Sequence, residues 1–278
     1  MPPILSCLPN SYGRFGPRAA IPRLRTIGLE QIELPIRTAE TALQFEDDPL
    51  ITTASTADDL EQVEQLLDEH AVRVSSCNIS SGNPLDPRVV EITFRKLDLA
   101  ARFGVDRVVG GAGEAASEDD RLRLYDHLRA IGDYAGSLGI TYCCETHPGV
   151  CQNHRGMIET MNAVDHPHVK INFDTGNILY YNEHIQGEVA LAKVCHLVRH
   201  VHLKDSRGEF GQWYFPALGD GGAVDFVRVL EILRDSGFNG PYSLEIEGIA
   251  GEPELSVAGY HRRVAESVEY LRTCGYFD

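Results

Sequence analysis

The chain has 278 residues, of which 43% are hydrophobic and 24% charged, and both fractions are ordinary for a globular protein. Its formal net charge of −16 argues against nucleic acids and anionic membrane surfaces as partners, because both attract clustered Lys and Arg. No apolar run approaches the roughly 20 residues of a membrane span, and the first residues lack a signal-peptide pattern, so we expect a cytoplasmic protein.

Strand patterns and helical patterns alternate along the chain. We expect strands within 3–8, 29–34, 72–79, 105–109, 140–145, 168–174, 198–204 and 238–245. Apolar residues at helical spacing predict helices over 57–69, 87–102, 117–137, 224–235 and 253–273. Four of the strands directly follow a glycine suited to the end of a helix, namely Gly28, Gly104, Gly139 and Gly237.

About eight such alternations predict a closed, parallel (β/α)8 TIM barrel, with residues 1–278 forming one α/β domain. A doubly wound open sheet is the alternative, although no GxGxxG follows the first strand. Two long connections, 36–55 and 205–222, are expected to lie over the active site, because the loops after barrel strands carry the chemistry.

Four strands in the second half of the chain end on side chains that commonly bind metals. These side chains are Glu145, Asp174, His202 and Glu245. Charge is rare in strands, and a barrel brings the ends of its strands to one mouth, so four such endings predict one shared divalent cation. Three carboxylates and one imidazole suit Mn²⁺ best, with Mg²⁺, Co²⁺ or Zn²⁺ as alternatives.

Three further polar residues are expected near the same mouth. His147 lies two residues beyond Glu145 on the same side of the strand, and Lys204 stands in the same relation to His202. Glu114 follows the glycine-rich end of the fourth strand. We predict that all three contact a substrate. A solvated loop position is the alternative for His147 and Glu114.

Three phrases around the predicted ligands resemble those of the sugar phosphate isomerase/epimerase superfamily of xylose-isomerase-like barrels. They are Phe173-Asp174-Thr175-Gly176-Asn177, His200-Val201-His202-Leu203-Lys204-Asp205 and Ser243-Leu244-Glu245-Ile246-Glu247. The resemblance implies that the four strand-end residues bind the metal and that Glu145 and Glu245 are also the catalytic acid and base. It further implies that Arg207 holds substrate oxygens. Asn177 stands where many members have His, so it can donate a hydrogen bond to substrate but cannot titrate.

The superfamily includes ketose 3-epimerases, hydroxypyruvate isomerase and inosose dehydratase, so the resemblance implies a metal-dependent isomerase or epimerase of carbohydrate metabolism. A Lewis acid at the mouth would favour proton removal next to the carbonyl of a keto sugar or polyol and stabilise the enediolate. A lyase or dehydratase acting on an inosose or a 3-keto-glycoside would use the same site. The second alternative is an inactive barrel that serves as a binding or assembly subunit. The expected partner is a small carbohydrate, and a homo-oligomer is compatible with the sequence.

Overall fold

Eight parallel strands form a closed barrel in the computed structural model, which describes residues 3–39 and 49–278. The barrel strands are β1 (Ile4–Cys7), β2 (Gln31–Arg37), β4 (Arg73–Asn78), β5 (Arg107–Gly110), β6 (Thr141–Glu145), β7 (Val169–Asp174), β8 (Val198–Leu203) and β10 (Pro241–Leu244). They neighbour one another in the order β1-β10-β8-β7-β6-β5-β4-β2, and β1 also pairs with β2, which closes the ring. The predicted (β/α)8 barrel is therefore confirmed, and the open sheet is excluded.

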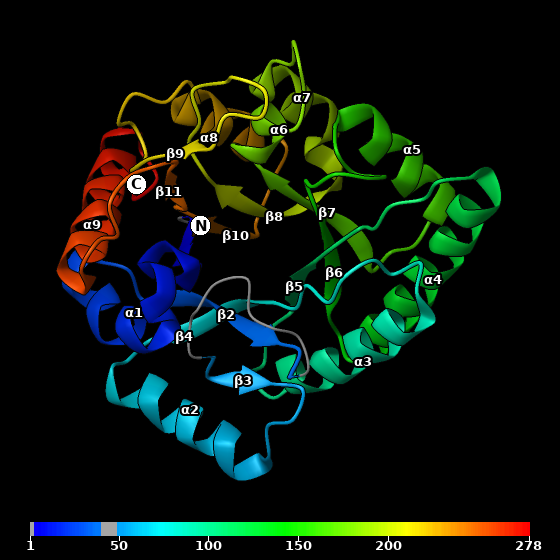
Figure 1. The fold of residues 1–278 in the computed structure, drawn as a ribbon, viewed down its shortest axis with the longest axis horizontal. Helices are drawn as coiled ribbons and strands as arrows, with labels where there is room; N and C mark the ends of the chain where they lie inside the picture. Colours follow the sequence, from blue (N-terminus) through cyan, green and yellow to red (C-terminus); the bar gives the residue numbers. More distant parts are fainter. Residues whose placement is uncertain (1–2, 40–48) are drawn as a thin grey trace.

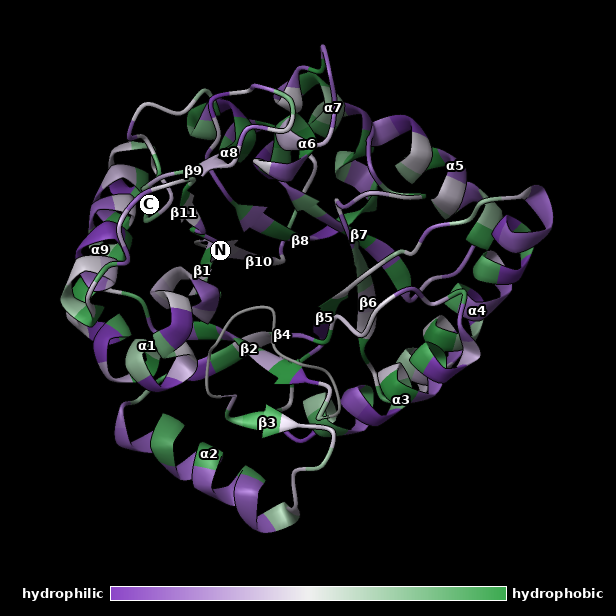
Figure 2. Ribbon diagram, in the orientation of Figure 1, coloured by the Kyte–Doolittle hydropathy of each residue, from purple (hydrophilic) through white to green (hydrophobic). Residues whose placement is uncertain are grey.

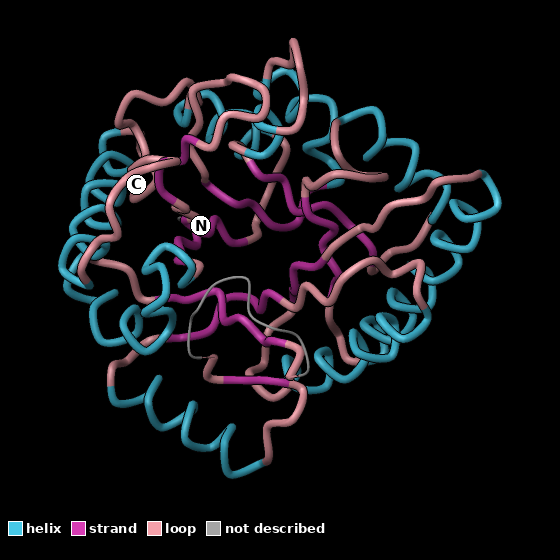
Figure 3. The backbone as a smooth tube through the Cα atoms, in the orientation of Figure 1, coloured by secondary structure: helices cyan, strands magenta, loops and turns pink. Residues whose placement is uncertain are grey.

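Helices follow the barrel strands and surround them (Figure 1, Figure 3). The α-helices are α1 (Gly16–Leu24), α2 (Ala57–Glu69), α3 (Pro87–Ala101), α4 (Glu118–Ser137), α5 (His154–Val164), α6 (Asn177–Tyr180), α7 (Gly187–Val194), α8 (Phe226–Asp235) and α9 (Val257–Thr273). Three short 3-10 helices cover Pro9–Phe15, Arg25–Ile27 and Cys195–Leu197. Helices α2, α3, α4, α8 and α9 match the five predicted ones closely. Helices α1, α5, α6 and α7 lie where the sequence patterns predicted none.

Three very short strands lie in or beside the connections after barrel strands. β3 (Ile51–Thr52) pairs with β2, and β9 (Tyr214–Phe215) pairs antiparallel with β11 (Gly248–Ile249). The β9–β11 pair joins the long loop after β8 to the segment after β10, at the carboxyl end of the barrel strands. Of the other long connection, residues 40–48 lie outside the described residues.

Local signals in the sequence explain where the helices begin and end. Thr56 and Asp59 form a capping box at the start of α2, and the Ser117 hydroxyl accepts the backbone N–H of Asp120 in the first turn of α4. Gly139 and Gly237 have φ angles of 73° and 74°, the left-handed conformation expected just past a helix. Within the described residues, no helix combines the length and the apolar character needed to cross a bilayer.

The apolar core lies between the barrel and its ring of helices, and Figure 2 shows hydrophobic residues along the helix faces that meet the strands. Polar side chains on six of the barrel strands are also buried. They include Ser6, Glu33, Ser76, Asn172, His200, His202 and Ser243. Such groups are costly to bury unless they are hydrogen-bonded or paired with charge. The barrel strands therefore hold a polar cluster that leads toward the carboxyl ends of the strands.

Candidate active site

The four strand-end residues lie together. Each of Glu145, Asp174, His202 and Glu245 offers one ligand-type atom, and these atoms all lie within 4.8 Å of one another. Their strands β6, β7, β8 and β10 are consecutive neighbours in the barrel, and the register pairs Asp174 with His202. Neighbouring parallel strands thus bring four residues distant in sequence to one point.

In two of the carboxylates, one oxygen accepts hydrogen bonds from the protein and the other accepts none. Asp174 Oδ1 accepts the backbone N–H groups of Gly176 and Asn177, each at 2.8 Å. Glu245 Oε1 accepts the side-chain N–H of Asn10 at 2.8 Å. The second oxygens, Asp174 Oδ2 and Glu245 Oε2, are buried and have no hydrogen-bond partner. An orphaned buried carboxylate oxygen is costly, so two of them facing one centre indicate a site for a cation.

The two ring nitrogens of His202 also have different surroundings. Its Nε2 lies 3.1 and 3.0 Å from the two carboxylate oxygens of Glu33. Its Nδ1 lies 3.1 Å from Glu245 Oε2, 3.4 Å from Glu145 Oε1 and 3.9 Å from Asp174 Oδ2. Nε2 is thus occupied by Glu33, whereas Nδ1 faces the three carboxylates and also lies 3.1 Å from the side-chain nitrogen of Asn172. This donor set, three carboxylates and one imidazole nitrogen, fits a divalent cation.

The charges in the cluster influence one another strongly. Burial raises the pKa of Asp174 well above its usual range. Burial alone would also raise the pKa of Glu245, but the charges of Lys204 and His202 hold it well below its usual range. Burial would lower the pKa of His202, but Glu33 and Glu245 raise it well above the usual value. The carboxylates therefore attract positive charge to the point that a bound cation would occupy.

Lys204 is buried on the wall of this cluster. Its ammonium forms an ion pair with Glu247, and Nζ lies 3.5 Å from Glu245 Oε2 and 3.8 Å from Asp174 Oδ2. Nζ also lies 4.5 Å from the ring centroid of Phe215. Sequence reasoning had placed Lys204 at the mouth. It did not single out Glu247, although Glu247 shares the strand phase of Glu245.

Tyr181 is a wall residue that sequence reasoning missed. Its hydroxyl lies 3.1 Å from Nε2 of His147, which is exposed on the loop after β6. Burial raises the pKa of Tyr181 to about 12, and the neighbouring charges of Lys204 and Glu247 also influence it. Tyr181 directly follows α6, the short helix after β7 and Asp174, so it lies at the same end of the barrel as the cluster. The sequence patterns did not indicate the position of Tyr181, because they did not predict the four-residue helix α6 that precedes it.

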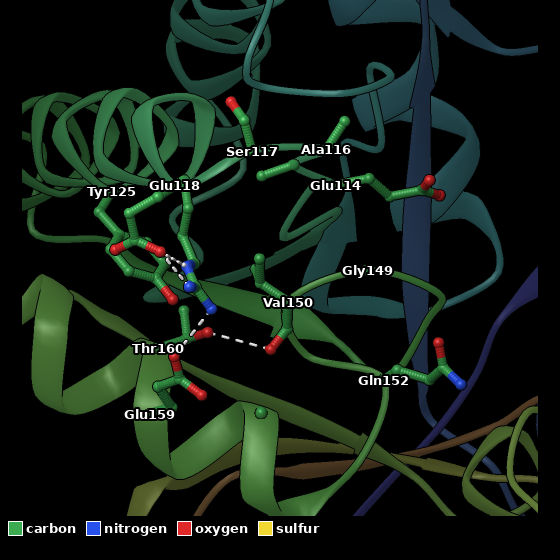
Figure 4. A pocket seen from close by; sticks show the side chains of 13 residues that line it. Glu114, Ala116, Ser117, Glu118, Tyr125, Gly149, Val150, Gln152, Glu159 and Thr160 are labelled. Carbon is green, nitrogen blue, oxygen red and sulfur yellow. Dashed lines mark hydrogen bonds and ion pairs between the residues drawn. The ribbon is translucent and has the colours of Figure 1, made fainter.

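The other three predicted substrate contacts lie in different surroundings. Asn177 is buried, and its backbone N–H anchors Asp174. Arg207 is exposed, with its guanidinium 3.8 Å from the ring centroid of Tyr214. Glu114 is exposed and lines a separate cavity of about 500 Å³ beside helices α4 and α5 (Figure 4). Among the described residues, no hydrogen bond or ion pair joins the side chains of Arg207 or Glu114 to the cluster.

Comparison with known proteins adds an independent observation. The sequence model of a family described as "Xylose isomerase-like TIM barrel" matches residues 21–274. An inosose dehydratase from Geobacillus thermodenitrificans is 28% identical over 177 residues, which cover 57% of this chain and 56% of that protein. The L-ribulose-5-phosphate 3-epimerase UlaE of Salmonella typhimurium is 29% identical over 177 residues, which cover 61% and 60%. The chain thus spans less than two thirds of the length of these relatives.

A solved structure supports the fold over the whole chain. A xylose isomerase-like TIM barrel protein from Mycobacterium smegmatis, crystallised in complex with magnesium, superposes with a TM-score of 0.73. The superposition covers 100% of this chain and 98% of that one at 18% sequence identity. At this identity the similarity establishes the barrel architecture only.

Proposed function

This chain belongs to the xylose isomerase-like TIM barrel family, and from that premise we propose a divalent-metal-dependent isomerase or epimerase acting on an unphosphorylated keto sugar or polyol. The main support for this proposal is a pair of buried carboxylate oxygens, Asp174 Oδ2 and Glu245 Oε2. They accept no hydrogen bond and face Nδ1 of His202. With Glu145 they would hold one ion, of which Mn²⁺ suits the donor set best and Mg²⁺, Co²⁺ or Zn²⁺ are alternatives. Such an ion, when bound, acts as a Lewis acid toward a carbonyl oxygen.

The carboxylates of Glu145 and Glu245 carry the proton transfers in this proposal. They stand on β6 and just after β10, with β7 and β8 between them, so they can approach a substrate from different sides. One carboxylate removes the proton from the carbon next to the carbonyl, and the electron pair passes into the carbonyl unit. The other, in its acid form, returns a proton to the opposite face and inverts that carbon. If the proton returns instead to the former carbonyl carbon, and the hydroxyl proton of the first carbon passes to the other oxygen, the product is an isomer.

The preference for an unphosphorylated substrate rests on how the nearby cations are already engaged. The Lys204 ammonium is paired with Glu247 and lies close to two further carboxylates. The Arg207 guanidinium stacks on Tyr214. A phosphate dianion would compete with these contacts and with the net charge of −16, whereas neutral hydroxyl groups would not.

A dehydratase is the second candidate, and the similarity to an inosose dehydratase favours it. Here a carboxylate again removes the proton next to the carbonyl. The bond to a hydroxyl on the next carbon then breaks, and the departing oxygen takes up a proton to leave as water. Tyr181, with its hydroxyl on His147, stands beside the cluster as a group able to donate that proton.

The two candidates can be separated by NMR in D₂O with Mn²⁺-loaded enzyme and a panel of keto sugars and inososes. Deuterium at one carbon without loss of water supports the isomerase or epimerase, whereas loss of water or of an aglycone supports the lyase. The same reactions run after chelation provide the control. No exchange with any substrate of the panel would favour a binding or assembly subunit and contradict the proposal.

Tyr181→Phe tests the contribution of the Tyr181–His147 pair. The change removes only the hydroxyl, so kcat/KM should fall by up to about tenfold, equivalent to one hydrogen bond of about 0.5–1.5 kcal/mol. Steady-state kinetics at saturating metal measure this effect. Tyr134→Phe is the control, since that hydroxyl donates to Asp98 on the outer helices and should leave the kinetics unchanged. Unchanged kinetics in Tyr181→Phe would exclude the hydroxyl from the reaction.

Arg207→Ala tests whether the loop after β8 reaches the substrate. We expect KM to rise about two- to tenfold, the value of one hydrogen bond of about 0.5–1.5 kcal/mol, with metal content unchanged. Arg228→Ala is the control, because Arg228 pairs with Glu231 on the exposed face of α8. Loss of metal together with activity would instead assign the loop a structural role. If neither changes, sugar recognition must come from residues such as His147, Asn177 and Lys204.

We also propose that residues 1–278 act as one barrel domain. A cytoplasmic location and a homo-oligomeric state stay predictions.

A further inference from the structure

Glu33 is a buried carboxylate that the proposed reaction does not use. It lies in the middle of β2, on the barrel wall across from β7, and its side chain is fully buried. Both of its oxygens lie within 3.1 Å of His202 Nε2. A buried carboxylate is costly unless its charge is compensated, so its presence here calls for a function.

The chemistry of this contact determines which nitrogen of His202 carries a proton. An ionised carboxylate can only accept hydrogen bonds, so Nε2 must be the protonated nitrogen wherever Glu33 holds it. Nδ1 is then the nitrogen whose lone pair can bind a cation, and it is also the nitrogen that faces Glu145 and Glu245. The contact with Glu33 is therefore consistent with His202 binding a cation through Nδ1.

A second metal site at the same place is the competing interpretation. Glu33, His200 and His202 also offer three ligand-type atoms within 4.8 Å of one another. These atoms, however, already have partners: Ser76 Oγ lies 2.9 Å from His200 Nε2, and Glu33 occupies His202 Nε2. None of them is among the orphaned buried atoms of the described residues, unlike the free oxygens of Asp174 and Glu245. The hydrogen bonds of Glu33, His200 and His202 are therefore already made within the protein, which argues against a second metal site.

We propose that Glu33 is a positioning residue, which holds His202 with its Nε2 proton inward and its Nδ1 lone pair toward the metal, and so sets the metal affinity of the site. The inference rests on the proposed function, because it assumes that His202 is a ligand. A carboxylate behind a ligating imidazole fixes the ring and raises its basicity, and loss of such a group typically weakens metal binding about 10–100-fold.

The test compares Mn²⁺ binding by calorimetry in the wild type, Glu33→Gln and Ser76→Ala. Gln keeps the shape and can still accept the Nε2 proton, but it lacks the charge, so Kd should rise about 10–100-fold with one ion per chain. Ser76→Ala changes a buried polar residue on the neighbouring strand that contacts His200 and not His202, so its Kd should stay close to that of the wild type. Thermal unfolding checks that each variant is folded.

The outcomes separate this inference from the proposed function. If the wild type binds no divalent ion, the proposed function fails. If the wild type binds one ion and Glu33→Gln binds it equally tightly, only the role of Glu33 is refuted. Two ions in the wild type and one in Glu33→Gln would make Glu33 a direct ligand, which also contradicts the proposal.

A second measurement needs no Glu33 variant and therefore holds even if Glu33→Gln does not fold. Long-range ¹H–¹⁵N NMR of the Zn²⁺-loaded wild type, labelled at histidine, reports which ring nitrogen carries the proton. His202→Asn identifies the signal by its absence. A proton on Nε2 agrees with the proposal, and a proton on Nδ1 overturns it.

Discussion

Replacing Glu245 by Gln is expected to lower turnover by about 10²–10⁴-fold, the usual contribution of a positioned general base, while the protein stays folded. Gln has the same shape, but its amide cannot remove a proton from carbon. Kinetics at saturating Mn²⁺, with the metal content measured on the same sample, test this expectation. Near-normal turnover with metal still bound would remove Glu245 from the acid/base role.

The surroundings of Glu245 explain why the variant should fold. Asn10 donates to Glu245 Oε1 at 2.8 Å, and Asn10 Oδ1 is itself buried without a hydrogen-bond partner. If the Asn10 amide turns over, its oxygen can accept from the new Gln amide, and the Gln oxygen can stay directed at the metal. Glu252→Gln is the matched control, since it removes a carboxylate that pairs with Arg263. Its turnover should be unchanged.

Replacing Asp174 by Ala should abolish metal binding. Asp174 Oδ2 is one of the two orphaned oxygens, so its loss should weaken Mn²⁺ binding by more than the about 10–100-fold typical of groups that only support a ligand. Ions that bind only the folded state raise the unfolding temperature. Added Mn²⁺ should therefore raise Tm in the wild type and leave it unchanged in the variant.

Asp205→Asn is the control for that measurement. Asp205 is also a buried carboxylate, but its oxygens accept backbone N–H groups of Ser206, Gly219 and Val224, so it has no free oxygen for a metal. The change should lower the stability of the loop after β8 and keep the rise of Tm with Mn²⁺. If Asp174→Ala also keeps that rise, Asp174 is not a ligand.

The sequence by itself determined the barrel and the four residues that converge in it. Strands repeat with a period of two and helices with a period near 3.6, and both periods are visible in a single sequence. Because all barrel strands run parallel, their last residues meet at one mouth, so the sequence alone predicts that Glu145, Asp174, His202 and Glu245 lie together. Charge at the end of an apolar strand is rare enough to be informative.

Short elements were less predictable. Helix α6 has four residues and α7 eight, too few to show a helical pattern, and α1 contains two prolines. These elements form because the barrel and neighbouring helices provide surfaces for them to pack on, which local propensity does not record. The position of Tyr181 depends on α6, and so the tyrosine was missed.

Only the tertiary structure decided what surrounds each ligand. Asn10 is 235 residues from Glu245, and Glu33 is 169 residues from His202. In the closed barrel, Asn10 nevertheless donates to Glu245, and Glu33 accepts from His202. These contacts select which oxygen or nitrogen is anchored and which faces the common centre. Pairing of β1 with β10 creates this arrangement, since it brings the first strands beside the last. The sequence shows which side chains can bind a metal. The direction of each lone pair depends on neighbouring residues that come together only in the closed barrel.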